Sequence, residues 1–177
     1  DNPTYAAMIE SVDESLGNII TELKKKKLYD KTAIIFTSDH GGLSNRGVNN
    51  RRKLATTNEP LRAGKGHVYE GGIKVPFIVY WQGKIMPGLT SEQLTINTDI
   101  FPTILDMAGL PMMPEAHLDG ESIRSSFNGE ATWARTFFWH SPLGRPHSTG
   151  DENASAIRKG DFKLINYYDK GTVELYN

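Results

Sequence analysis

The first part of the chain carries two different hydrophobic periods. Apolar side chains recur every three or four positions between Tyr5 and Leu23, and Asn2 followed by Pro3 is a typical helix start. This spacing predicts an amphipathic helix that covers one face of a sheet. The short apolar run 33–36 predicts a buried strand. Because the helix leads into this strand, their order predicts an α/β fold and parallel pairing with strands that are mostly absent from this sequence.

The middle of the chain contains a long polar segment and two further elements. Residues 43–67 are polar and contain glycines, and a loop of that length is uncommon unless it is functional or mobile. The apolar run 75–81 predicts a second strand. A second helix is expected to have Thr98 as its N-cap and Asp99 in its first turn, and to stop at Gly109.

The pattern changes again in the last third, where short apolar runs are separated by turn residues. The expected strands are 136–140, 154–158, 162–166 and 173–176, with a tight turn at 159–161. Such a series predicts a small antiparallel sheet. We therefore expect two parts, an α/β domain over residues 1–130 and an antiparallel subdomain over residues 131–177.

Composition and charge narrow the classes of partner. With 177 residues, 38% of them hydrophobic, and a formal net charge of −1, the chain has no single-sign excess that favours nucleic acid or an anionic membrane. The lysine run 24–27 ends the first predicted helix, where cations complement the helix dipole. No apolar run reaches the roughly 20 residues of a membrane span, and no secretory signal is visible. The absence of cysteine excludes disulfides and leaves the compartment open.

Candidate chemistry begins directly after the first predicted strand. The motif Thr37-Ser38-Asp39-His40-Gly41-Gly42 puts a carboxylate and an imidazole at the carboxyl end of that strand, where open α/β sheets bind ligands. A carboxylate suits a hard cation such as Ca²⁺, whereas a histidine suits it less well. His40 is therefore either a ligand or a neighbour that supports one. The alternative for Asp39 is a turn cap.

This motif and the blocks that follow it resemble a sulfatase of the alkaline-phosphatase superfamily. The blocks are 37–42, 61–76, 81–85, 99–106, 118–120 and 156–164. Their order is more specific than any single block, and together they extend over nearly the whole chain. The resemblance implies part of a mixed or parallel sheet sandwiched by helices, followed by the small antiparallel sheet. Residues 1–130 would then be the C-terminal part of the catalytic domain.

The resemblance also implies roles for individual residues. Asp39 and His40 would bind Ca²⁺, with Mg²⁺ as the alternative ion. Lys65 lies between two glycines and would contact the sulfate oxygens, where a compact ammonium neutralises charge; otherwise it is a solvated loop lysine. His67 lies two residues on and would assist at the sulfate, contact the substrate, or only pack against the loop. His140 resembles a substrate-binding position in the C-terminal subdomain.

The segment that supplies the nucleophile of sulfatases is not found in this sequence. It has the pattern C/S-x-P-x-R, and its Cys or Ser is converted to formylglycine. Residues 58–62 have Asn at the nucleophile position, and residues 141–145 have the proline one position early. Residues 173–177 resemble the beginning of the closing segment of the family. We therefore expect a C-terminal portion of a larger sulfatase, inactive alone, with formylglycine in a missing N-terminal half.

The activity implied by the resemblance is hydrolysis of sulfate esters. The substrate would be a sulfated small molecule or glycan, and the location periplasmic, extracellular or lysosome-like. One alternative is a phosphatase, phosphodiesterase or phosphonate hydrolase of the same superfamily, because a metal-bound Asp-His pair suits either tetrahedral anion. Another is a non-catalytic carbohydrate-binding module. The block 64–72, Gly-Lys-Gly-x-x-x-Glu-Gly-Gly, favours the sulfatase, and its Glu70 predicts a turn held by a carboxylate.

Overall fold

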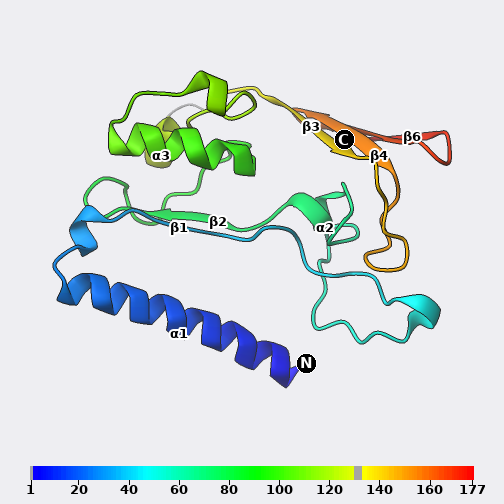
Figure 1. Ribbon diagram of the computed structural model, residues 1–177, viewed down its shortest axis with the longest axis horizontal. Coiled ribbons are helices and arrows are strands. Elements are labelled where there is room, and N and C mark those ends of the chain that lie inside the picture. The colour runs from blue at the N-terminus through cyan, green and yellow to red at the C-terminus, as the bar shows by residue number, and fades with distance from the viewer. Residues whose placement is uncertain (1, 130–132) are drawn as a thin grey trace. The chain divides into compact units, whose positions relative to one another are not determined.

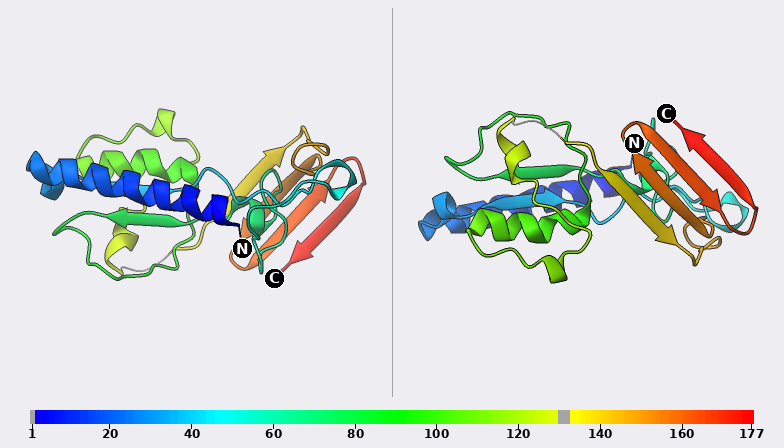
Figure 2. Two further views of the ribbon diagram at one scale, coloured as in Figure 1. Left: turned by 90° about the horizontal axis from the view of Figure 1, so that it is seen from below. Right: turned by 90° about the horizontal axis from the view of Figure 1, so that it is seen from above.

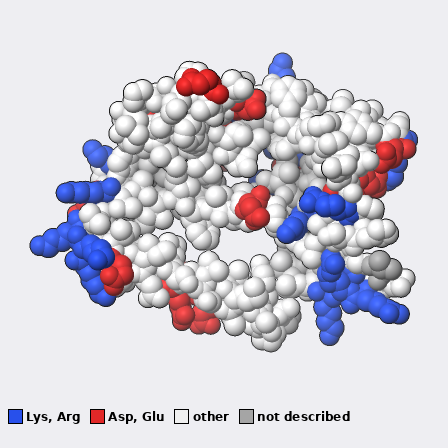
Figure 3. Space-filling model, viewed as in Figure 1, with Lys and Arg blue, Asp and Glu red and all other residues white. Residues whose placement is uncertain are grey.

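The chain divides into two compact units. A computed structural model describes residues 2–129 and 133–177, without the side chain of Val48. The first unit comprises Asp1–Gln82 and Phe138–Asn177, and the second comprises Gly83–Phe137 (Figure 1). The boundary expected between residues 130 and 131 lies outside the described residues. Among those that are described, no helix combines the length and apolarity that a membrane span requires. Both signs of charge are exposed on the face shown in Figure 3.

The first unit begins with the helix that the periodicity predicts. Helix α1 spans Pro3–Lys25, and the side chain of Asn2 accepts a hydrogen bond from the backbone N–H of Tyr5 at 3.0 Å. The apolar side chains along α1 remain accessible, with Met8 62% exposed and no residue of the helix buried. The helix therefore forms as expected, but the described residues do not bury its apolar face.

Two short strands form a separate ladder. Strand β1 (Ile34–Thr37) pairs with β2 (Phe77–Tyr80) in antiparallel register, with Ile35 opposite Val79. The described partner of β1 is thus antiparallel, and β1 is only partly buried rather than buried as expected; parallel pairing with strands outside this sequence stays a prediction. A helix before a strand implies parallel pairing only with a strand that precedes the helix. No described strand precedes α1.

The C-terminal part forms the expected antiparallel sheet. Its strands, in the spatial order β3-β4-β5-β6, are β3 (Thr136–Ser141), β4 (Ala154–Lys159), β5 (Phe162–Tyr167) and β6 (Thr172–Tyr176), which lie side by side in Figure 2. Each predicted strand is confirmed to within one residue at either end. Gly160 has a φ of 58° in the tight turn between β4 and β5, a conformation that favours glycine.

The two faces of this sheet have different environments because successive side chains of a strand alternate between them. The inner face packs against residues 68–69, and the buried cluster consists of Val68, Tyr69, Ala154, Ala156, Ile165 and Tyr167. The outer face exposes Phe138, Leu164, Val173 and Leu175. The inner face thus fixes the segment that follows Lys65 and His67.

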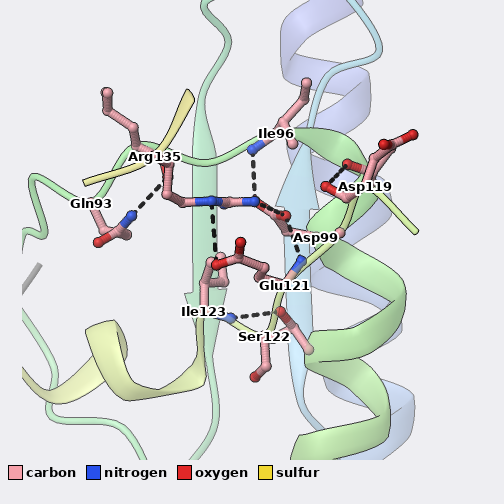
Figure 4. Close-up of polar contacts among 12 residues, drawn as sticks. Gln93, Ile96, Asp99, Asp119, Glu121, Ser122, Ile123 and Arg135 are labelled. Carbon is pink, nitrogen blue, oxygen red and sulfur yellow. Dashed lines mark hydrogen bonds and ion pairs between the residues drawn. The ribbon is translucent and has the colours of Figure 1, made fainter. Parts of the chain in front are cut away.

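The second unit is built around helix α3 (Ile100–Ala108) and a buried ion pair. The helix ends at Gly109, which has a φ of 66°. Asp99, rather than the expected Thr98, is the N-cap residue of α3. Its carboxylate accepts hydrogen bonds from the backbone N–H groups of Ile96 and Glu121 at 2.9 and 3.0 Å. Arg135 donates to both carboxylate oxygens, at 2.5 and 2.8 Å (Figure 4).

Candidate functional site

The Asp39-His40 segment leaves β1 and immediately meets the glycines of the short helix α2 (Glu70–Ile73). The backbone N–H of Gly41 donates to the carbonyl oxygen of Gly72 at 2.9 Å. A Cβ atom at Gly41 would lie 1.8 Å from the carbonyl oxygen of Gly71, a distance that no side chain tolerates. The two backbones therefore approach this closely only because glycine occupies position 41.

A second close approach joins the same segment to the Lys65 loop. The backbone N–H of Lys65 donates to the carbonyl oxygen of Gly42 at 2.9 Å, and a Cβ at Gly64 would lie 2.1 Å from that oxygen. The side chain of Asn58 bridges both segments, donating to the carbonyl oxygens of Gly42 and Ala63 at 2.8 Å each. The tertiary structure thus brings the predicted metal-binding segment and the predicted sulfate-binding segment together.

Asn58 was not singled out as a site residue from the sequence. It was noted only because an amide stands where the nucleophile of a C/S-x-P-x-R pattern would be. Its amide oxygen accepts from the backbone N–H of Gly42 at 3.1 Å, so the side chain completes a pair of reciprocal hydrogen bonds with one glycine. A polar residue in a long loop gives no sequence signal for such a bridge.

The side chains of Asp39 and His40 are in direct contact. Nδ1 of His40 donates to the carbonyl oxygen of Gly41 at 2.9 Å, and Nε2 lies 3.0 Å from Oδ2 of Asp39. Each ring nitrogen of His40 thus faces an oxygen atom. The Asp39 side chain is 81% exposed and therefore accessible to an ion.

A divalent cation would need further ligands. Ca²⁺ takes about six to eight oxygen ligands, and Asp39 offers at most two. Within the described ranges, no three His, Cys, Asp or Glu side chains gather closely enough to hold a metal ion. The carboxylate of Asp39 has the hard oxygen chemistry that Ca²⁺ or Mg²⁺ prefers. The pair therefore fits one side of a metal site.

The Lys65-His67 segment contacts the connection between β3 and β4. Nε2 of His67 donates to the carbonyl oxygen of Thr149 at 3.2 Å. Gly66 has a φ of 93°, and a Cβ there would lie 2.5 Å from Oδ1 of Asp151. Asp151 is 1% exposed, accepts a hydrogen bond from Thr149, and has Arg145 Nε 3.6 Å from its Oδ2. No sequence pattern indicates this buried carboxylate.

Residues of β6 contact the chain on both sides of the Lys65-His67 segment. The hydroxyl groups of Tyr69 and Tyr176 each donate to Oε2 of Glu174 at 2.5 Å. The guanidinium of Arg62 lies 4.0 Å from the centre of the Tyr69 ring and donates to the Tyr176 hydroxyl. The hydrogen bonds from Tyr176 and Tyr69 lower the pKa of Glu174, whereas burial and Glu174 raise that of Tyr69. This group was not predicted from the sequence.

His140 lies on the other face of the C-terminal sheet. Its Nδ1 is 2.8 Å from the hydroxyl of Ser155 and 3.1 Å from that of Tyr168. The neighbouring Trp139 packs against the buried cluster of the inner face, so alternation along β3 directs His140 outward. Among the described residues, the hydrogen bonds of His140 do not reach the Asp39 or Lys65 segment, and its substrate-binding role stays a prediction.

Two family profiles match this chain, and together they include the Asp39-His40 segment and the Lys65-His67 segment. The family profile described as "Sulfatase" matches residues 2–110. A second profile, described as "N-sulphoglucosamine sulphohydrolase, C-terminal", matches residues 63–177. The chain belongs to the sulfatase family. The first profile includes Asp39, His40 and Lys65, and the second includes Lys65 and the whole C-terminal sheet.

Individual relatives are much longer than this sulfatase chain. A sulfatase of Formosa agariphila is 31% identical and aligns with 98% of this chain and 33% of its own length. A protein solved in complex with its substrate D-glucosamine-2-N,6-O-disulfate superposes with a TM-score of 0.71, at 26% identity over 97% of this chain and 32% of its own. The phosphonate monoester hydrolase SpPMH from Silicibacter pomeroyi gives a TM-score of 0.64 at 26% identity, over 93% of this chain and 31% of its own. The chain thus spans about a third of the length of the proteins it matches.

Proposed function

We propose that the protein containing this chain hydrolyses sulfate esters of carbohydrates. The observation that supports this most directly is the backbone junction at Gly42, which joins the segment of Asp39 and His40 to the segment of Lys65 within a sulfatase-family chain. A carboxylate for a cation and an ammonium for an anion are what a negatively charged ester requires. The substrate class rests on the relative solved with a disulfated glucosamine.

The residues of this chain have separate roles in the proposed reaction. Asp39 holds one side of a Ca²⁺ or Mg²⁺ ion, and His40 either binds the ion or supports Asp39. Lys65 places a compact positive charge against the sulfate oxygens as their charge changes during transfer. His67, whose Nε2 is bonded to the carbonyl oxygen of Thr149, assists at the sulfate or contacts the substrate. The ion supplies positive charge at the transferring group, and a formylglycine outside this sequence supplies the nucleophile.

The proposal assigns the complete activity to the longer protein. No residue of the 177 lies in a C/S-x-P-x-R pattern, so the chain by itself has no convertible nucleophile. We also propose a location outside the cytoplasm, periplasmic, extracellular or lysosome-like, as the resemblance implies. Phosphonate or phosphate ester hydrolysis is the competing activity, because a phosphonate monoester hydrolase has a similar fold.

The test uses the full-length protein, purified with its formylglycine and with Ca²⁺. We expect turnover of a 6-O-sulfated glucosamine and of an arylsulfate, with slower turnover of the matching phosphate and phosphonate esters. Preference for the phosphorus esters would replace the sulfatase proposal by its alternative. Absence of turnover on every ester would favour the non-catalytic carbohydrate-binding module, which binding of the sulfated sugar without hydrolysis would identify.

A further inference from the structure

The glycine pair of α2 is the junction between the two halves of the candidate site. Gly72 accepts a hydrogen bond from the backbone of Gly41, two residues after Asp39. A Cβ at Gly72 would lie 2.1 Å from the carbonyl oxygen of His67 and 2.6 Å from that of Gly64. A small displacement of α2 therefore moves the Asp39-His40 segment relative to the Lys65-His67 segment.

The charged side chain of Glu70 connects α2 to the C-terminal sheet. Oε1 of Glu70 lies 2.9 Å from Nζ of Lys163, and Oε2 lies 3.3 Å from Nη1 of Arg158. Glu70 is the first residue of α2 and precedes both glycines directly. Each carboxylate oxygen thus binds a different strand, because Lys163 belongs to β5 and Arg158 to β4.

The two cations need this carboxylate. Lys163 and Arg158 are directly opposite each other in the β4-β5 ladder, where like charges repel. The side chain of Lys163 is only 7% exposed, and its ammonium lies 5.0 Å from the centre of the Trp139 ring. A nearly buried ammonium beside another cation is strongly unfavourable without an anion between them. The attraction of both cations for the Glu70 carboxylate therefore holds α2 against the sheet.

We propose that Glu70, bound between Lys163 and Arg158, is a positioning residue that sets α2 against Gly41 and so fixes the Asp39-His40 pair relative to Lys65. The inference rests on the proposed function for its catalytic consequence. Its structural consequence, the protection of the Gly41 amide by Gly72, is independent of any activity. The C-terminal sheet thereby acts on the metal side of the site although none of its strands carries Asp39 or His40.

The test compares Glu70→Gln with wild type in the full-length protein. Hydrogen exchange measured by mass spectrometry follows the peptide that covers residues 38–43 and the peptides that cover β4 and β5. We expect exchange at 38–43 to accelerate at least tenfold while the β4-β5 peptides remain protected. Calorimetry should show Ca²⁺ affinity at least tenfold weaker, and turnover at low Ca²⁺ should fall more than turnover at saturating Ca²⁺.

Two further variants separate positioning from general stability. Glu152→Gln removes the exposed Lys170–Glu152 ion pair of the same unit and should leave exchange at 38–43 and Ca²⁺ affinity unchanged. The double variant Glu70→Gln with Lys163→Met removes the buried ammonium and should regain thermal stability, because neutral replacements of a buried pair are tolerated. Its 38–43 peptide should still exchange fast and its Ca²⁺ affinity should stay weak.

The proposal is wrong if the 38–43 peptide of Glu70→Gln exchanges at the wild-type rate. It is also wrong if that peptide recovers in the double variant together with thermal stability, since Glu70 would then have only a structural role. Neither result depends on turnover. An inactive wild-type protein would instead count against the proposed function, so the two failures are distinguishable.

Discussion

The hydroxyl of Tyr69 donates to Oε2 of Glu174 at 2.5 Å and joins the candidate site segment to the last strand of the sheet. The two residues are 105 positions apart in the sequence. Tyr69 follows His67 by two residues, and its ring belongs to the buried cluster of the inner sheet face. The position of the Lys65 loop therefore depends on an anion in β6.

The carboxylate of Glu174 gives the first prediction, which concerns the stability of the protein at acid pH. Hydrogen bonds from Tyr176 and Tyr69 lower the pKa of Glu174 below its ordinary value of 4.5. A lowered pKa in the folded state means that the stabilisation is complete above pH 4.5 and is lost as the pH falls through the folded pKa. Glu174→Gln should be less stable than wild type at pH 7, and its thermal midpoint should fall less between pH 5 and 3. Parallel pH profiles of the two proteins would contradict this assignment.

The glycine contact at position 41 gives a second prediction with a matched control. Gly41→Ala should destabilise the protein by at least about 3 kcal/mol, because its Cβ would overlap the Gly71 carbonyl oxygen. Gly17→Ala lies in α1 with no atom within 4 Å of the new Cβ. That variant should gain about 0.5–1 kcal/mol from the higher helix propensity of alanine. Urea unfolding measures both, and a neutral Gly41→Ala would disprove the close approach.

The buried ion pair of the second unit gives the third prediction. Arg135→Met should cost about 3–5 kcal/mol of stability, because it leaves the fully buried Asp99 carboxylate without its cation. Arg124→Met removes a half-exposed partner of Asp106 and should cost less than about 1 kcal/mol. The free energies of unfolding in denaturant should separate the two variants clearly. Equal losses would mean that burial does not decide the strength of these pairs.

Lys65 gives a kinetic prediction in the full-length enzyme. If its ammonium neutralises the sulfate oxygens, Lys65→Ala should lower kcat by on the order of a hundredfold or more. Lys65→Arg should rescue activity poorly, because a planar guanidinium does not replace a compact charge between Gly64 and Gly66. Lys53→Ala, in the same polar loop, is the control and should remain near wild type. Normal turnover of a sulfated sugar by Lys65→Ala, with folding unchanged, would make Lys65 an ordinary solvated lysine.

The last prediction concerns the 177-residue chain alone. It should hydrolyse no arylsulfate with or without Ca²⁺, because it contains no convertible nucleophile. Its Ca²⁺ binding should be weak, since Asp39 and His40 provide only part of the six to eight ligands that the ion requires. Calorimetry and an arylsulfate assay measure both properties. Turnover that disappears in Asp39→Ala, or tight stoichiometric Ca²⁺ uptake, would refute the assignment.

Several features could be predicted because they depend on neighbouring residues. The helical period and the Asn2-Pro3 start defined α1, and alternation with turn residues defined the four C-terminal strands. The Asp39-His40 motif and the glycines around Lys65 were also visible as local patterns. The N-cap of α3 was assigned one residue early, at Thr98. The carboxylate of Asp99 makes no capping bond to α3 and instead accepts hydrogen bonds from residues 96, 121 and 135, which local sequence does not reveal.

The sequence by itself determined the elements, the family and the candidate chemistry at Asp39 and Lys65. The tertiary structure decided that β1 pairs antiparallel with β2, that α2 joins the two candidate segments, and that Glu70 and Glu174 anchor them. Local patterns are set by backbone preferences and by which side chains avoid water. A buried charge instead takes whatever opposite charge the folded chain brings near it, and for Glu70 that partner lies 93 residues away in the sequence.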